Sequence, residues 1–117
     1  MRALLLLLLL SPGLSLAGEE SPGREIAFGL KVAQKGLWQE ARFRFERAVQ
    51  LEPGNAAALN DLAVALEQMG EFEEARKAYE KALQVKPGDV YIQQNYDLFR
   101  EADDKRNRKS RKKGPRP

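Results

Sequence analysis

A repeat of fixed length constrains this chain more than any other feature of its sequence. Residues of matching type recur at an offset of 34 positions, and Pro53 and Pro87 stand at the ends of two such units. The other matched pairs are Gly36 with Gly70, Ala41 with Ala75, Phe45 with Tyr79, Ala48 with Ala82, Trp38 with Phe72 and Phe28 with Leu62. A constant period of this length is typical of stacked repeats, in which each unit buries its apolar face against its neighbours. The sequence therefore predicts an all-α, stacked-repeat fold.

Glycine and proline divide the chain into five predicted helices. Ser21-Pro22 is a typical helix start, because serine caps the first turn and proline fits the first helical position. Gly36 and Gly70 are typical helix ends, because glycine readily adopts the left-handed conformation found there. We expect helices over residues 22–35, 37–51 and 56–69, a fourth between Gly70 and Pro87, and a fifth over residues 90–104.

The fifth helix begins like a third repeat, but no turn glycine and no partner helix follow it. The open end of a solenoid is closed by an atypical element with one polar face. We therefore expect residues 90–104 to form a capping helix on the second repeat. Its packed residues should be Ile92, Tyr96 and Phe99, and its water-facing residues Asp97, Arg100, Glu101 and Asp104.

The repeated unit resembles that of the tetratricopeptide repeat family. Counted from Pro22 and from Ala56, the two units match the family's small residues, turn glycine, aromatic residue and closing proline between residues 22 and 104. The matches are Gly29 and Ala63, Gly36 and Gly70, Ala41 and Ala75, Phe45 and Tyr79, Ala48 and Ala82, and Pro53 and Pro87. The resemblance implies a short right-handed α-solenoid of antiparallel helix pairs, with repeats over residues 22–55 and 56–89.

The sequence also departs from the family's pattern. Glu25 stands where the family favours a large apolar residue, which suggests an exposed and loosely packed first helix. Two repeats and a cap are fewer than the three repeats that such folds usually need. We therefore expect modest stability or weak self-association through the apolar edge near Phe28 and Trp38, although Trp38 also suits the repeat core.

The resemblance further implies a concave groove, lined by the first helix of each repeat, that takes an extended peptide or a helix of a partner protein. By position, the groove residues are Ile26, Leu30, Asn60, Asp61, Val64, Glu67, Tyr91, Gln94, Asn95 and Leu98. This mixture of apolar, acidic and amide side chains favours a basic or amphipathic segment as the ligand. Asn60 and Asn95 would either hydrogen-bond the backbone of the ligand or satisfy neighbouring helix ends.

Missing residue types argue against catalysis. The chain has no His and no Cys, so no Ser-His or Cys-His nucleophile pair can form. Zinc sites in nearly all cases need these same two residue types as ligands. No feature of the sequence brings two carboxylates into a closed pocket. We expect a non-catalytic interaction module without a cofactor or a metal.

Residues 1–17 have the composition of a signal peptide. Arg2 precedes an apolar run over residues 4–10, and Ser15 and Ala17 place small side chains at the two positions that a signal peptidase reads. The run is shorter than the ~20 residues that span a bilayer. We therefore expect cleavage after Ala17 in preference to an uncleaved anchor, and export of the protein to a periplasm or out of the cell.

Charge is distributed unevenly along the chain. Residues 18–104 carry 11 basic and 17 acidic side chains, whereas residues 105–117 carry eight basic ones and no acidic one. Because a block of like charge repels itself, we expect a disordered basic tail over residues 105–117. Its cations include Lys105, Arg106, Arg108, Lys109, Arg111, Lys112 and Lys113.

The basic tail suggests an alternative function, namely binding to an anionic membrane surface or polymer. The tail has no aromatic residue on which a base could stack, so nucleic acid is not the expected partner. A third interpretation is that the tail only keeps the protein soluble or folds back on the acidic body.

Overall fold

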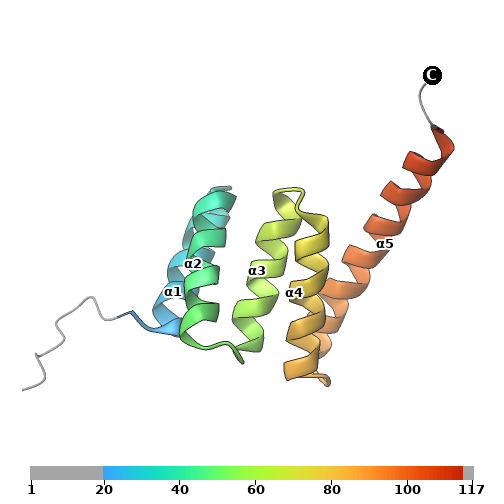
Figure 1. The fold of residues 1–117 in the computed structure, drawn as a ribbon. Coiled ribbons are helices and arrows are strands. Elements are labelled where there is room, and N and C mark those ends of the chain that lie inside the picture. The colour runs from blue at the N-terminus through green and yellow to red at the C-terminus, as the bar shows by residue number, and fades with distance from the viewer. Residues whose placement is uncertain (1–19, 115–117) are drawn as a thin grey trace, which may run out of the picture.

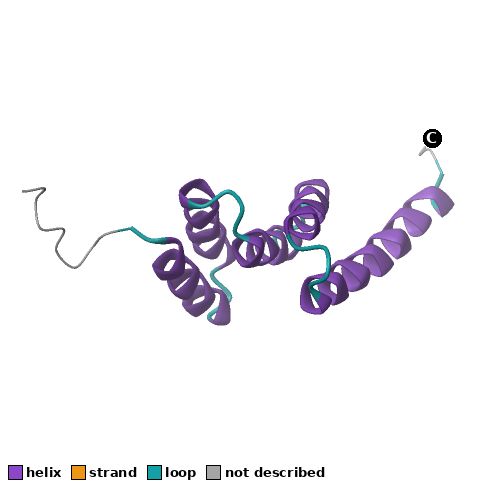
Figure 2. Cartoon of the chain, turned by 90° about the horizontal axis from the view of Figure 1, so that it is seen from below, coloured by secondary structure: helices purple, strands orange, loops and turns teal. Residues whose placement is uncertain are grey.

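The computed structural model describes residues 20–114, which form five helices joined by short turns (Figure 1). The helices are α1 (Pro22–Gln34), α2 (Trp38–Leu51), α3 (Ala56–Gln68), α4 (Phe72–Val85) and α5 (Val90–Lys112). No strand occurs within this part of the chain, as Figure 2 also shows. The predicted all-α fold is therefore confirmed. The predicted signal peptide lies outside the described residues, and so do residues 115–117.

Local side-chain chemistry fixes the helix ends. At the starts of α1, α3 and α5, the side chains of Ser21, Asn55 and Asp89 each accept a hydrogen bond from the backbone N–H three residues later. The turns inside the repeats contain Gly36 with φ 76° and Gly70 with φ 78°. An L side chain is strained in this left-handed conformation, so each turn depends on its glycine.

The helices pack in sequence order into a short solenoid. α1 lies along α2, α3 lies along α4, and α2 packs against α3 to join the two pairs (Figure 1). Phe45 and Tyr79 are the largest fully buried side chains together with Phe99. Trp38 is half-buried and packs against the cluster of Val32 and Phe45. The core role that the repeat pattern gave to these positions is thus observed.

The first helix pair approaches most closely where Gly29 faces Phe45. A Cβ atom added to Gly29 would lie 2.5 Å from Cε1 of the Phe45 ring. The absence of a side chain at residue 29 therefore lets the Phe45 ring lie directly on the backbone of α1. Ala63 occupies the equivalent position of α3 and belongs to the same buried cluster as Tyr79.

The predicted loose packing of the first helix is wrong at Glu25. Its residue is only 7% exposed, and Glu25 Oε2 lies 3.4 Å from Nη1 of Arg44 on α2. The Arg44 guanidinium also covers the ring of Phe28, 4.2 Å from its centroid. An ion pair thus replaces the apolar contact that the family favours at residue 25, and it holds the start of α1 against α2.

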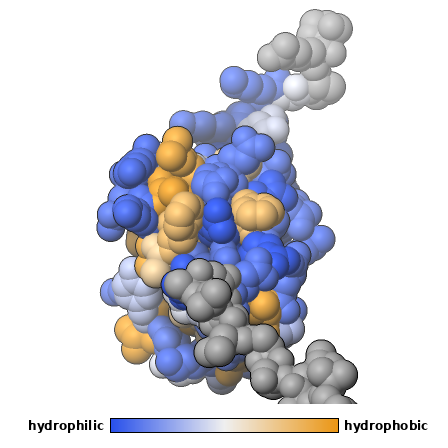
Figure 3. All heavy atoms as spheres, turned by 90° about the vertical axis from the view of Figure 1, so that its left-hand side faces the viewer, coloured by the Kyte–Doolittle hydropathy of each residue, from blue (hydrophilic) through white to orange (hydrophobic). Residues whose placement is uncertain are grey.

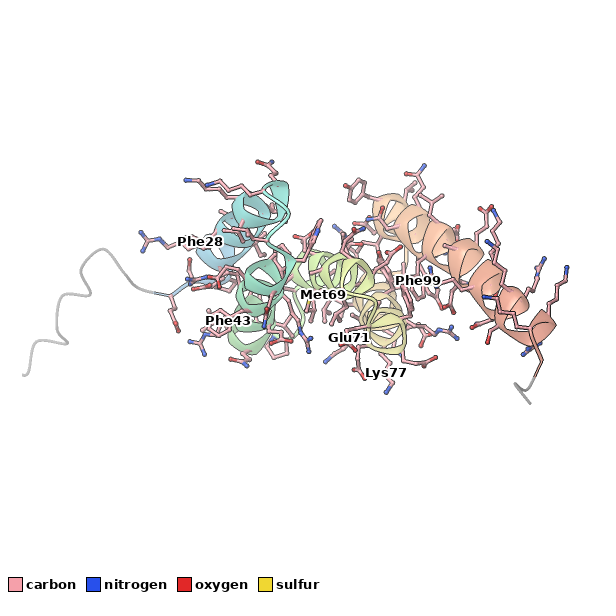
Figure 4. All side chains as sticks on the ribbon, turned by 90° about the horizontal axis from the view of Figure 1, so that it is seen from above. Phe28, Phe43, Met69, Glu71, Lys77 and Phe99 are labelled. Carbon is pink, nitrogen blue, oxygen red and sulfur yellow. The ribbon has the colours of Figure 1, made fainter. Side chains whose placement is uncertain are left out.

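The capping role of α5 is observed. Ile92 and Phe99 are buried, and the rings of Tyr96 and Phe99 lie 5.8 and 5.4 Å from that of Tyr79. In Figure 4, Phe99 lies on the side of α5 that faces α4. The side chains predicted to face water, Asp97, Arg100, Glu101 and Asp104, are all exposed. No helix between residues 20 and 114 has the length and apolar character needed to cross a membrane.

The predicted helix end at Asp104 is wrong, and so is the predicted disorder for residues 105–112. α5 continues to Lys112 and projects beyond the other helices (Figure 1). The reason is that acidic side chains compensate the first cations: Asp103 is 5% exposed and pairs with Arg76 of α4 and with Arg106. Arg106 also lies 3.5 Å from the centroid of the Phe72 ring. The basic side chains after Arg106 also stabilise α5, because positive charge is favourable near the C-terminal end of a helix.

Both ends of the solenoid expose apolar side chains. At the end formed by α1 and α2, Phe28, Leu37 and Phe43 remain exposed. Figure 3 shows apolar side chains on this end as separate patches among hydrophilic ones, and Figure 4 labels Phe28 and Phe43 there. At the other end, α5 exposes Val90, Tyr91 and Leu98 among polar side chains. Self-association itself stays a prediction.

The close approach of Gly29 to Phe45 predicts a large effect of a single methyl group. Gly29→Ala should lower the free energy of unfolding by about 1–3 kcal/mol, because either the ring or the helix must move. Gly23→Ala is the matched control in the same helix, since an added Cβ there has no atom within 4 Å. Urea denaturation of both variants tests this, and equal midpoints would show that the contact is not tight.

Candidate functional site

A groove of about 310 Å³ lies between α1, α3 and α5. Its lining combines apolar and aromatic surface with three amides and one carboxylate. The lining residues are Leu30, Ala33, Gln34, Trp38, Phe45, Asn60, Asp61, Val64, Tyr91 and Asn95.

A second hollow of about 430 Å³ adjoins this groove. The two share Asn60, Asp61 and Tyr91. The second hollow extends from there over the turns before α3 and α5, where Glu52, Lys86 and Asp89 carry charge. The two together form a continuous surface suited to an elongated ligand.

Of the ten predicted groove residues, the structure brings six together. Leu30 comes from α1, Asn60, Asp61 and Val64 come from α3, and Tyr91 and Asn95 come from α5.

The other four predicted residues lie outside the groove. Ile26 is half-buried elsewhere on α1, and Leu98 is exposed farther along α5. Gln94 lines a separate hollow beside the α4–α5 turn. Glu67 is engaged with the core: the Tyr79 hydroxyl donates to Glu67 Oε2 at 2.9 Å. Burial and the neighbouring Glu67 raise the pKa of Tyr79.

Sequence reasoning missed the contribution of α2 to the groove. Trp38 and Phe45 line it together with Gln34, although the repeat pattern assigned the concave face to the first helices alone. Trp38 follows the turn at Gly36, and it reaches the groove from there while it also packs on the core. A large aromatic residue directly after the turn glycine is the signal that could have indicated this.

The two groove asparagines bind each other. Asn95 Nδ2 of α5 donates to Asn60 Oδ1 of α3 at 3.1 Å, and Asn60 is 3% exposed. The sequence did not predict this contact, and a hydrogen bond from either amide to a ligand stays a prediction. The hydrogen bond between Asn95 and Asn60 thus joins α5 to α3 directly beside Asp61.

Asp61 is the electrostatic centre of the groove. Burial raises its pKa to about 6, although the hydrogen bond from Asn60 works in the opposite direction by favouring the charged form. A carboxylate that loses solvent without gaining a cation is destabilised in its charged form. Within residues 20–114, no group of three or more acidic side chains is arranged to hold a metal ion.

The raised pKa of Asp61 predicts how stability depends on pH. Because the folded protein binds this proton more tightly than the unfolded chain, the contribution of Asp61 to stability falls as pH rises from about 4 through about 6. Asp61→Asn should therefore raise the free energy of unfolding at neutral pH, on the order of 1–2 kcal/mol after allowance for solvent screening. The gain should vanish near pH 4.

Denaturation of the Asp61→Asn variant at several pH values checks this, with the exposed Asp97→Asn variant of α5 as the control. An Asp61→Asn variant that is less stable than the wild type at neutral pH would contradict the assignment.

Comparison with known proteins gives the family. The tetratricopeptide repeat model matches residues 33–94, which is more than half of the chain and includes both turn glycines. Among solved structures, the crystal structure of MamA protein is similar, with a TM-score of 0.66 and 28% identity. That match covers 75% of this chain and 48% of MamA, so the chain spans about half the length of that protein. No curated protein matches. The chain belongs to the tetratricopeptide repeat family.

Proposed function

We propose that this protein is a scaffold that binds a segment of a partner protein in the groove between α1, α3 and α5. The family and the fold support a protein–protein interaction module in general, and such modules are generally not enzymes. Groove binding by this chain is the further step proposed here.

The continuity of the concave surface is the observation that carries this proposal. The groove and the adjoining hollow share three residues, so a ligand can extend from Leu30 past Asp61 to the turn at Asp89. Leu30 and Tyr91 are 45% and 69% exposed on this surface. Exposed apolar and aromatic side chains beside buried amides are typical of a site that closes over a partner.

The proposal predicts that Leu30 touches the partner. A photoreactive benzoylphenylalanine at residue 30 should crosslink a protein in the native compartment, whereas the same group at Leu37 should not. Leu37 is the matched control, because it is also exposed but lies outside the groove. Leu30→Asp should then weaken binding of the identified segment about tenfold, whereas Leu37→Asp should leave it unchanged. Equal crosslinking at both positions would contradict groove binding.

The projecting end of α5 supports a second candidate function, binding to an anionic membrane surface. Lys105 and Arg106 are engaged with Glu101 and Asp103. The remaining cations of this end are exposed and have no ion pair within residues 20–114, and they are Arg108, Lys109, Arg111, Lys112 and Lys113. No apolar side chain lies among them, so binding would be electrostatic and would not involve insertion.

Vesicle binding tests this second function. Replacing Arg108, Lys109, Arg111 and Lys112 by Gln should abolish binding to phosphatidylcholine vesicles that contain about 30% phosphatidylserine, since each surface cation contributes about 1 kcal/mol. The wild type should lose binding when salt rises to about 0.5 M. Binding that survives either change, or equal binding to vesicles without phosphatidylserine, would rule the function out.

A further inference from the structure

Asp61 differs from the other buried and half-buried carboxylates of the described chain in having no cation or hydroxyl donor beside it. Within residues 20–114, the shielded carboxylates other than Asp61 each have a cation or a hydroxyl donor from another position in the chain. The pairs are Glu25 with Arg44, Glu40 with Arg44, Glu46 with Arg42, Glu67 with Tyr79, Asp89 with Lys86, and Asp103 with Arg76 and Arg106. Asp61 has neither a cation nor a hydroxyl donor among the described residues.

The Asp61 carboxylate has no counter-ion within residues 20–114. Its neighbour Asn60 is fixed by a 3.1 Å hydrogen bond from Asn95 of α5. Folding alone therefore leaves this half-buried carboxylate uncompensated. Such an arrangement lowers stability unless a cation from outside the chain completes it.

The surroundings of Asp61 suit a long basic side chain. Leu30, Trp38 and Val64 provide apolar surface on one side, along which the methylene groups of Lys or Arg can pack. Tyr91 provides an aromatic ring on α5, and aromatic faces attract cations. The adjoining hollow adds the carboxylates of Glu52 and Asp89 against the single cation of Lys86, so negative charge predominates there as well.

We propose that Asp61 binds a Lys or Arg side chain of the partner segment, next to an apolar residue of that segment that packs on Leu30 and Val64. This inference rests on the proposed function and names the class of ligand: an apolar residue beside a basic one. The charge of the ligand and the charge of Asp61 would then stabilise each other.

The proposal also implies that binding depends on pH. Protonation of Asp61 removes the charge that the ligand needs, so affinity should fall as pH drops below about 6. The other titratable groups that face this region are Tyr91 of α5, Tyr79 of α4, Glu52 after α2, and Lys86 and Asp89 of the α4–α5 turn. Burial raises the pKa of Tyr79, and the Ile92 backbone N–H lowers that of Asp89, so neither changes its charge in this range.

Matched synthetic peptides test the proposal. An array of short capped peptides would place Arg next to Leu in varied sequences. Each Arg peptide has a matched control peptide in which citrulline replaces Arg. Citrulline has nearly the shape of Arg but no charge, and the caps remove the terminal amine. Wild-type protein should bind the best Arg peptides about tenfold more tightly than their citrulline partners. The Asp61→Asn variant should bind both forms equally, and only the wild type should lose affinity between about pH 7.5 and about pH 5.

The outcomes separate the two claims. The proposed contact between Asp61 and a basic side chain is wrong if the Asp61→Asn variant keeps the preference for Arg. It is also wrong if uncapped citrulline peptides bind as tightly as capped Arg peptides. If, in the same experiment, Leu30→Asp still weakens binding, the groove remains the binding site and only the contact with Asp61 is contradicted. If no peptide binds the wild type, both the contact with Asp61 and the binding of a linear segment in the groove are overturned. Asp97→Asn is the control for an acidic residue of α5 outside the groove.

Discussion

In each repeat, a small residue of the first helix faces a large aromatic ring of the second, and the rest of the structure depends on this contact. The Phe45 ring lies directly on the backbone at Gly29, and Tyr79 shares its buried cluster with Ala63. The contact sets how closely the two helices of a pair approach. The same rings fill the space toward the next element, because Tyr79 also meets Phe99 of the cap at 5.4 Å between ring centroids.

The groove follows from this packing. With the second helices buried against the next repeat, α1, α3 and α5 present their free sides to one concave surface. The cap completes that surface, since it contributes Tyr91 and Asn95 and fixes the Asn60 amide. The site therefore combines a well-packed scaffold with one unfavourable element, the shielded charge of Asp61. A residue that reduces the stability of the free protein and favours the bound state is expected at a binding site.

Periodicity made much of the fold predictable from sequence. The 34-residue spacing indicated the helices, the turn glycines and the small and aromatic core residues, because each of these follows from local conformation or from helical spacing. Six of the ten predicted groove residues meet for the same reason, since position within a repeat fixes the face of a helix.

The features that sequence reasoning missed depend on side chains that are distant in the chain. Arg44 meets Glu25 across 19 positions, Asp103 meets Arg76 across 27, and Asn95 meets Asn60 across 35. The Asp103 contact is the reason why α5 does not end at Asp104, and composition alone gave no sign of it. The lack of a cation at Asp61 could not be read from sequence either, because Glu40 and Asp89 are acidic residues of the same helical domain that do pair, with Arg44 and Lys86.

The most direct measurement of the central claim is the titration of the Asp61 carboxyl carbon by NMR, in the free protein and with a saturating Arg-containing peptide. The account predicts a midpoint near pH 6 in the free protein, because burial raises the pKa of Asp61 to about 6. It also predicts a clear fall of this midpoint in the complex, because a bound cation favours the charged carboxylate. A midpoint near the ordinary value for aspartate in the free protein, or the same midpoint with and without the peptide, would contradict the account.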